Sequence, residues 1–175
     1  MKYFVIITCS IYIAIIANLS LLRYLIDIRY WDGLSIVPIL LLSYIFLGLY
    51  SNISIWYKLS DSTKYGFYIS IIGTFITLIL NFFLIPIYSY YGAACSSLIT
   101  YFIMTLVSYF MGKTIYNIPY DLKSNIYYLT IALLITFIIG YIFNFNIFIG
   151  NVFLLLYTFY VYRKEKQFIK KIIFD

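Results

Sequence analysis

The sequence predicts an all-α protein, a polytopic bundle of about six helices that cross a lipid bilayer, with both ends of the chain on the cytoplasmic side. Of its 175 residues, 65% are hydrophobic and only 10% are charged. Soluble chains contain about 45–50% apolar and about 25% charged residues, so a globule of this length would expose much of its apolar surface to water. In lipid the outside of a bundle is also apolar, which removes the difficulty.

The second observation is a series of six apolar runs, each close to the length of about 20 residues that a spanning helix needs. None of them contains Asp, Glu, Lys or Arg. Only Asn144 separates the last two runs, and Asn144 and Asn146 favour a tight turn there. Pro38 falls in the first turn of the second run, and Pro86, just after the third, predicts the end of that helix. The runs cover residues 3–22, 34–53, 67–85, 93–111, 125–143 and 145–162, and a basic tail covers 163–175.

The third observation is the distribution of Lys and Arg. Six crossings place ten of the twelve basic residues on the side of the two chain ends, and only Arg23 and Arg29 on the other. Because cytoplasmic segments carry the excess of Lys and Arg, both termini are expected in the cytoplasm. The tail is expected to contact anionic headgroups of membrane lipids, and no nucleic acid is expected as a partner. The headgroup-contacting residues are Arg163, Lys164, Lys166, Lys170 and Lys171.

Catalysis is not expected from this composition. The chain has no histidine, which removes the commonest general base and metal ligand. Cys9 and Cys95 lie inside apolar runs without metal-ligand spacing. We therefore expect no enzymatic activity, no metal and no cofactor. The acidic residues are scattered over the predicted loops and tail: Asp27, Asp32, Asp61, Asp121, Glu165 and Asp175.

Polar residues follow one face of the third run and one face of the fourth. Spacings of three and four residues place side chains on the same side of a helix. One interpretation is a packing seam, in which small residues let helices approach and hydroxyls bond across the contact. The other is the wall of a polar cavity for a hydrophilic headgroup. The sequence leaves both open for Ser70, Thr74, Thr77, Asn81, Ser96 and Thr100.

Three segments occur in order around these runs: YGFYISIIG (65–73), LNFFLIP (80–86) and YGAACSSLITY (91–101). They are flanked by YWDGLSIVPILL (30–41), NISIWYKL (52–59) and IPYDLK (118–123). In their order and spacing these segments resemble polysaccharide flippases of the multidrug/oligosaccharidyl-lipid/polysaccharide exporter superfamily. The resemblance covers roughly residues 1–125, and the remainder is similar in hydropathy alone.

The resemblance implies a translocase of the bacterial cytoplasmic (inner) membrane. Such flippases move undecaprenyl-diphosphate-linked oligosaccharides outward during the synthesis of polysaccharides such as lipopolysaccharide O-antigen. They are built from two pseudo-symmetric bundles of about six helices around a central cavity. This chain is similar to roughly the last four helices of the second bundle plus two appended ones, so it is expected to be a C-terminal fragment. Its expected partners are the lipid-linked oligosaccharide and either the missing N-terminal portion or a second copy.

The alternative is a non-transporting structural or remnant membrane protein that packs against other membrane subunits. A membrane enzyme of cell-envelope synthesis is disfavoured, because the chain lacks histidine and its predicted spans lack carboxylates. Movement of a lipid-linked sugar by the chain would exclude the remnant.

Overall fold

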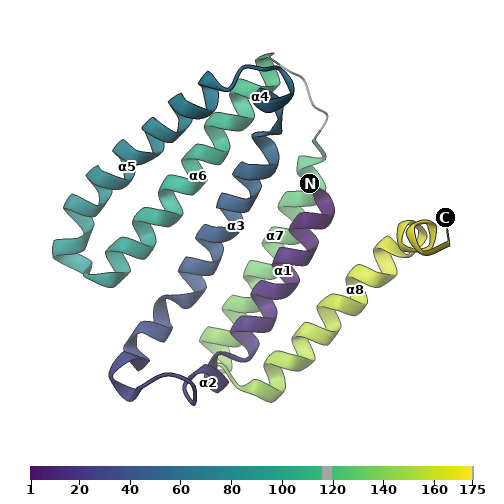
Figure 1. Ribbon diagram of the computed structural model, residues 1–175. Helices are drawn as coiled ribbons and strands as arrows, with labels where there is room; N and C mark the ends of the chain where they lie inside the picture. The colour runs from purple at the N-terminus through teal and green to yellow at the C-terminus, as the bar shows by residue number, and fades with distance from the viewer. Residues whose placement is uncertain (116–119, 175) are drawn as a thin grey trace. The chain divides into compact units, whose positions relative to one another are not determined.

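The computed structural model describes residues 1–115 and 120–174, with side chains up to Lys166 in the last helix (Figure 1). These residues form helices joined by short turns and contain no strand, which confirms the predicted all-α class. Among the described helices, four stretches are long and apolar enough to cross a membrane, as expected for a membrane protein. They are Ile28–Leu59, Lys64–Tyr88, Tyr90–Ile115 and Leu122–Ile142.

The chain divides into two compact units. Unit 1 comprises Asp32–Leu122 together with Met1, and unit 2 comprises Lys2–Trp31 together with Lys123–Asp175. Apart from Met1, the first unit is therefore one continuous segment of chain, whereas the second joins segments from the two ends of the chain.

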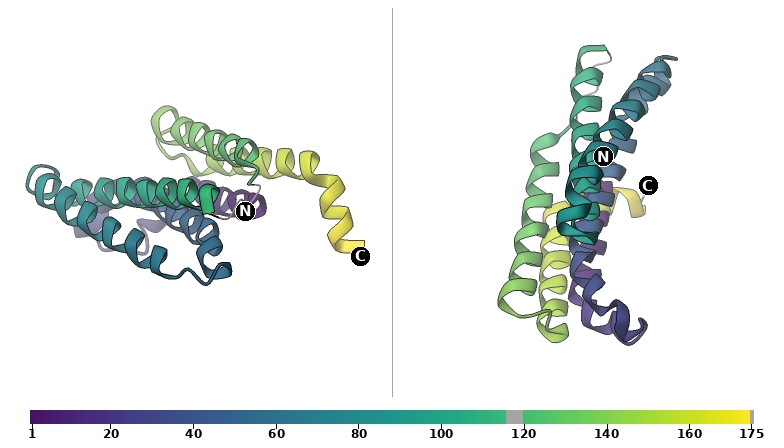
Figure 2. Two further views of the ribbon diagram at one scale, coloured as in Figure 1. Left: turned by 90° about the horizontal axis from the view of Figure 1, so that it is seen from above. Right: turned by 90° about the vertical axis from the view of Figure 1, so that its left-hand side faces the viewer.

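Unit 1 is built around α6, which packs against both α3 and α5 and lies between them in Figure 1. Ser89 alone separates α5 from α6, so the two form a tight helical hairpin, seen from two further directions in Figure 2. The elements are η1 (Ile28–Ile36, continuing from unit 2), α3 (Val37–Ile53), α4 (Ile55–Leu59), α5 (Lys64–Tyr88) and α6 (Tyr90–Ile115).

The two prolines of unit 1 behave differently. Pro38 lies in the first turn of α3, as predicted. The prediction that Pro86 follows the helix is wrong, because α5 continues through it to Tyr88. A proline in the last turn removes only its own N–H, which would bond the carbonyl four residues earlier. The helix ends instead at Ser89, which has a positive φ of 52° and donates its N–H to the Ile85 carbonyl at 2.8 Å.

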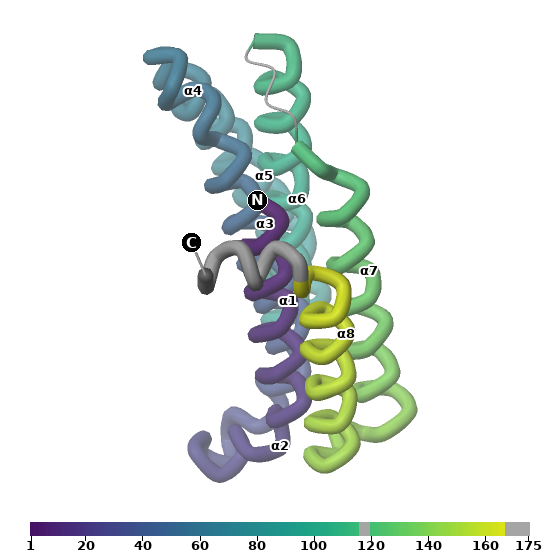
Figure 3. Tube along the Cα trace, turned by 90° about the vertical axis from the view of Figure 1, so that its right-hand side faces the viewer, coloured from purple at the N-terminus to yellow at the C-terminus, as the bar shows by residue number. Residues whose placement is uncertain are grey.

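Unit 2 consists of α1, α2, α7, η2 and α8, and α8 runs alongside α1 (Figure 3). The approach is close at Gly150, where an added Cβ would lie 2.8 Å from the Cα of Ala17. The elements are α1 (Lys2–Ala17), α2 (Leu19–Leu22), α7 (Leu122–Phe137), a π-helical turn η2 (Ile138–Ile142) and α8 (Ile147–Phe174).

The first predicted run is interrupted. Asn18 departs from helical geometry with φ −107° and ψ 16°, and its side-chain amide donates to the Ala14 carbonyl at 2.9 Å. An amide that bonds local backbone competes with the helical ladder. As a result α1 contains 16 residues, shorter than the predicted 3–22.

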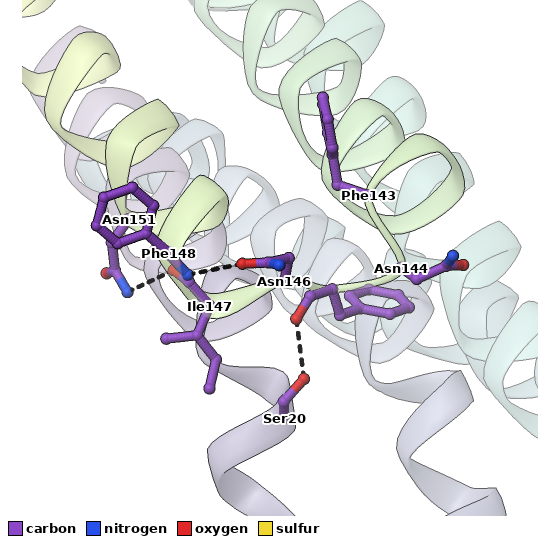
Figure 4. A pocket seen from close by; sticks show the side chains of 8 residues that line it. Ser20, Phe143, Asn144, Asn146, Ile147, Phe148 and Asn151 are labelled. Carbon is purple, nitrogen blue, oxygen red and sulfur yellow. Dashed lines mark hydrogen bonds between the residues drawn. The ribbon is translucent and has the colours of Figure 1, made fainter.

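The predicted tight turn before α8 is confirmed. Asn144 and Phe145 both have positive φ, at 45° and 57°. Asn146 Oδ1 then accepts from the backbone N–H groups of Phe148 at 3.0 Å and Ile149 at 3.4 Å, which caps the start of α8 (Figure 4). At its other end α8 continues to Phe174, so the basic tail extends the last helix.

Candidate functional site

Two of the predicted residues form a polar contact across the seam between α5 and α6. The hydroxyls of Thr77 and Thr100 are hydrogen-bonded with 3.0 Å between their oxygens, and Thr100 is 2% exposed. One turn away the helices approach closely, because an added Cβ at Gly73 would lie 2.5 Å from the Met104 sulfur. A small residue and a hydroxyl pair in one contact are typical of packed membrane helices.

Ser70 and Thr74, from the same predicted stripe, do not join this contact. Both are exposed on α5, and each hydroxyl donates to a carbonyl of its own helix. Ser70 donates to Gly66 at 2.8 Å, and Thr74 to Ser70 at 2.9 Å. Hydroxyls satisfied in this way need no partner helix and no polar ligand.

Asn81 and Ser96 occupy the next position of the seam. Asn81 lies one turn after Thr77 on α5, and Ser96 one turn before Thr100 on α6. The antiparallel register therefore places Asn81 and Ser96 opposite each other. Asn81 Oδ1 and Ser96 Oγ are both buried, and neither has a hydrogen-bond partner within the part of the chain that the structure describes. The stripe thus has a satisfied end at Thr77 and an unsatisfied end at Asn81.

A longer stripe on α6 extends beyond the predicted residues. Trp56, fully buried, donates its Nε1–H to the Ser108 carbonyl at 3.1 Å. Thr105 Oγ1 lies 3.0 Å from the Phe46 carbonyl of α3. The sequence prediction followed only the first half of this stripe. Its buried residues recur every four positions: Gly92, Ser96, Thr100, Met104, Ser108 and Gly112.

Unit 2 contains a buried carboxylate that the sequence did not single out. Glu165 is 7% exposed and lies on α8. Its Oε1 lies 2.7 Å from Lys2 Nζ of α1 and accepts from the Tyr128 hydroxyl of α7 at 2.7 Å. Burial raises the pKa of Glu165, but the bonds from Lys2 and Tyr128 outweigh it and hold that pKa below its ordinary value. One side chain therefore links α1, α7 and α8 of the unit.

Basic residues of the tail lie beside aromatic rings. Lys164 Nζ is 3.9 Å from the centroid of the Tyr127 ring and 5.7 Å from that of Tyr160. Arg163 lies 5.2 Å from the Phe159 ring. These distances suit cation–π contacts, while the residues stay exposed, as headgroup contact requires.

Three headgroup candidates remain on the tail. Lys166 is exposed. The side chains of Lys170 and Lys171 lie outside the described residues.

The opposite end of unit 2 carries an open groove of about 740 Å³ (Figure 4). Ser20 donates to the Phe145 carbonyl at 2.9 Å there. Asn18 and Asn151 exchange amide hydrogen bonds of 3.3 and 3.1 Å, joining α1 and α8. The polar groups at this groove are thus used to fix the turn before α8.

Comparison of the chain with family models, with curated proteins and with solved structures finds no match. Fold and hydropathy thus define its class, an α-helical membrane protein.

Proposed function

We propose that this chain is the C-terminal part of a flippase that moves undecaprenyl-diphosphate-linked oligosaccharide units across the bacterial cytoplasmic membrane. The observation that carries the proposal is the ordered set of segments at 65–73, 80–86 and 91–101, which resembles that family. These segments lie within the α5–α6 hairpin. The proposal assigns the chain to polysaccharide or lipopolysaccharide biosynthesis.

The proposed topology has six crossings with both termini in the cytoplasm. Ten of the twelve basic residues support it by their placement. The ion pair between Lys2 and Glu165 is compatible with it, because it joins the start of α1 to the basic segment that follows the apolar part of α8 inside unit 2. In this topology α1 crosses with the help of α2 and flanking residues, since 16 residues span only about 24 Å of helix.

The unsatisfied end of the α5–α6 stripe supports a role beyond packing. Buried polar atoms without partners are rare in folded proteins and require an explanation. Asn81 and Ser96 provide two of them at one register position. A hydrophilic cargo or a further protein segment would supply the missing hydrogen bonds.

The alternative is a structural membrane protein without transport activity. The Thr77–Thr100 bond and the self-satisfied hydroxyls of Ser70 and Thr74 favour it, because four of the six predicted residues are then satisfied without a polar ligand. Alternating access also needs two lobes with a site between them, which six helices from one end do not supply.

A reconstitution experiment separates the two proposals. Proteoliposomes would contain this chain alone, or this chain with the product of an upstream reading frame that encodes the first helices of a flippase. Movement of a fluorescent lipid-linked oligosaccharide is expected only with both polypeptides. Absence of movement from a verified complex of the two would reject the flippase proposal. Movement by neither, with stable binding to other membrane subunits, favours the structural role.

A further inference from the structure

We propose that residues 23–31 lie in the headgroup layer of the membrane, where phospholipid covers them and fixes the end of the first crossing. This segment follows α2, includes the start of η1 and belongs to unit 2. We call it the interfacial segment. The proposal concerns the depth of the segment in the membrane and does not depend on the proposed flippase.

Large apolar side chains of the interfacial segment are not covered by the protein. Tyr24 is 87% exposed, Leu25 82% and Ile28 74%. Complete transfer of one such side chain from water to an apolar environment is favourable by about 1.5–3 kcal/mol. A position in bulk water would forgo this contribution at several places within a few residues. Contiguous exposed apolar surface of this kind marks contact with a protein or with a membrane.

The backbone and charges of the segment exclude the opposite position, deep in the hydrocarbon. α2 ends at Leu22 and η1 begins at Ile28, and turns connect them. Peptide groups outside a continuous helix lack part of the helical bonding, and hydrocarbon offers them no other partner. The segment also contains an exposed ion pair, with 3.2 Å between Arg29 Nε and Asp27 Oδ1, and charged side chains are costly at the bilayer centre. A layer that is partly apolar and partly hydrated satisfies both requirements.

The helices on either side place the segment at a boundary of the membrane. A crossing needs about 20 residues, and Lys2–Leu22 (α1 and α2) and Val37–Leu59 (α3 and α4) each provide that length. The apolar stretch that begins at Ile28 contains 32 residues, so the crossing does not need η1. The interfacial segment therefore connects the end of one crossing to the start of the next, and its apolar residues continue the lipid-facing stretch.

Aromatic and basic side chains of the segment select phospholipid as the partner. Trp31 donates its Nε1–H to the Ile26 carbonyl at 3.2 Å, and the Arg23 guanidinium lies 5.7 Å from the centroid of its ring. Trp and Tyr are enriched at the headgroup level, because their rings are apolar and their hydrogen-bonding groups polar. Arg23 forms no ion pair within the described part of the chain, so a lipid phosphate provides its counter-ion. An apolar surface of another protein would not provide one.

The two tryptophans of the chain give a probe and a matched control. Trp56→Phe leaves Trp31 as the single fluorophore, and Trp31→Phe leaves Trp56, which is fully buried. In phospholipid vesicles, lipids brominated near the headgroup should quench Trp31 at least twofold more strongly than lipids brominated near the chain ends. Trp56 should be quenched weakly by both and by aqueous iodide. Strong quenching of Trp31 by iodide alone, or stronger quenching by the deep lipids, would overturn the proposal.

Spin labels measure the same depth with both tryptophans in place. In a chain with Cys9 and Cys95 replaced by Ala, a label at Leu25→Cys is compared with labels at Phe75→Cys and Thr63→Cys. Phe75 is exposed in the middle of α5, and Thr63 is exposed just before that helix. The ratio of collision rates with oxygen and with a water-soluble nickel complex should place Leu25 between the two controls. A ratio equal to that of either control, or protection from both reagents as under a protein partner, would contradict the assignment.

Discussion

Removal of the Glu165 carboxylate is expected to loosen unit 2 selectively. Glu165→Ala takes away the acceptor of two charge-assisted contacts and leaves the buried Tyr128 hydroxyl without its partner. Such bonds contribute about 1.5–3 kcal/mol each in soluble proteins. Lys2 is 29% exposed, and interhelical bonds in bilayers average about 0.6 kcal/mol, so we expect a combined loss of about 2 kcal/mol.

Hydrogen exchange followed by mass spectrometry measures this loss unit by unit. A loss of about 2 kcal/mol corresponds to about 30-fold faster exchange through unit 2 opening, visible in peptides of α1 and α8. Peptides of the α5–α6 hairpin should be unchanged. Asp27→Asn serves as the control carboxylate, because Asp27 pairs with Arg29 on the exposed surface and its loss should leave both units unaffected. Equal acceleration in both units, or none in α1, would contradict the proposed role of Glu165.

The pH dependence has a defined sign. Because the folded-state pKa of Glu165 lies below its ordinary value, the carboxylate stabilises unit 2 at pH values above the ordinary pKa. The contribution is lost as pH falls through the lowered pKa. Protection factors in α1, which correct for the pH dependence of intrinsic amide exchange, should therefore be constant from neutral to mildly acidic pH and should fall only in strong acid. This fall should be absent in Glu165→Ala.

Two further substitutions test the close contacts within each unit. Gly150→Leu should destabilise unit 2 by about 1–3 kcal/mol, because the leucine side chain would overlap the backbone of Ala17. The control is Gly33→Ala, because no atom lies within 4 Å of the added Cβ. If Gly150→Leu left hydrogen exchange in unit 2 unchanged, the close contact would be rejected. Trp56→Phe removes the donor to Ser108 and should destabilise the α4–α6 contact by about 1 kcal/mol in a denaturing-detergent titration. An unchanged midpoint would mean that the bond contributes nothing.

The fold class was predictable because each charge-free run requires lipid by its own composition, without reference to distant residues. Charge-free runs must be helical wherever lipid surrounds them, since the backbone has no other hydrogen-bond partner there. Two helix ends were predicted wrongly because they depend on features that no local pattern contains. Asn18, at the break after α1, also exchanges hydrogen bonds with Asn151, 133 positions away in the sequence, and no local pattern reports that pairing. The end of α5 depends on Ser89, whose positive φ the sequence does not reveal.

The site was predictable in part. Helical spacing identified the α5–α6 stripe, but only the rotation and register of both helices decide that Thr77 meets Thr100 while Ser70 faces outward. The sequence places Glu165 only among the acidic residues scattered over the predicted loops and tail. Its pairing with Lys2 had one signal in the sequence. Glu165 is the lone acid among the basic residues of the last helix, and the predicted topology places both it and Lys2 on the cytoplasmic side. Which tyrosine it accepts from could not be read from spacing alone.

The most direct test of six crossings with cytoplasmic ends is labelling of single cysteines in intact cells with a membrane-impermeant maleimide. Asp27→Cys and Lys58→Cys, in a chain otherwise free of cysteine, place exposed probes at the two ends of the stretch Ile28–Leu59. We predict that Asp27→Cys reacts from outside and that Lys58→Cys reacts only after the cells are opened. Reaction of both before opening, or recovery of the chain in the soluble fraction without detergent, would contradict the account.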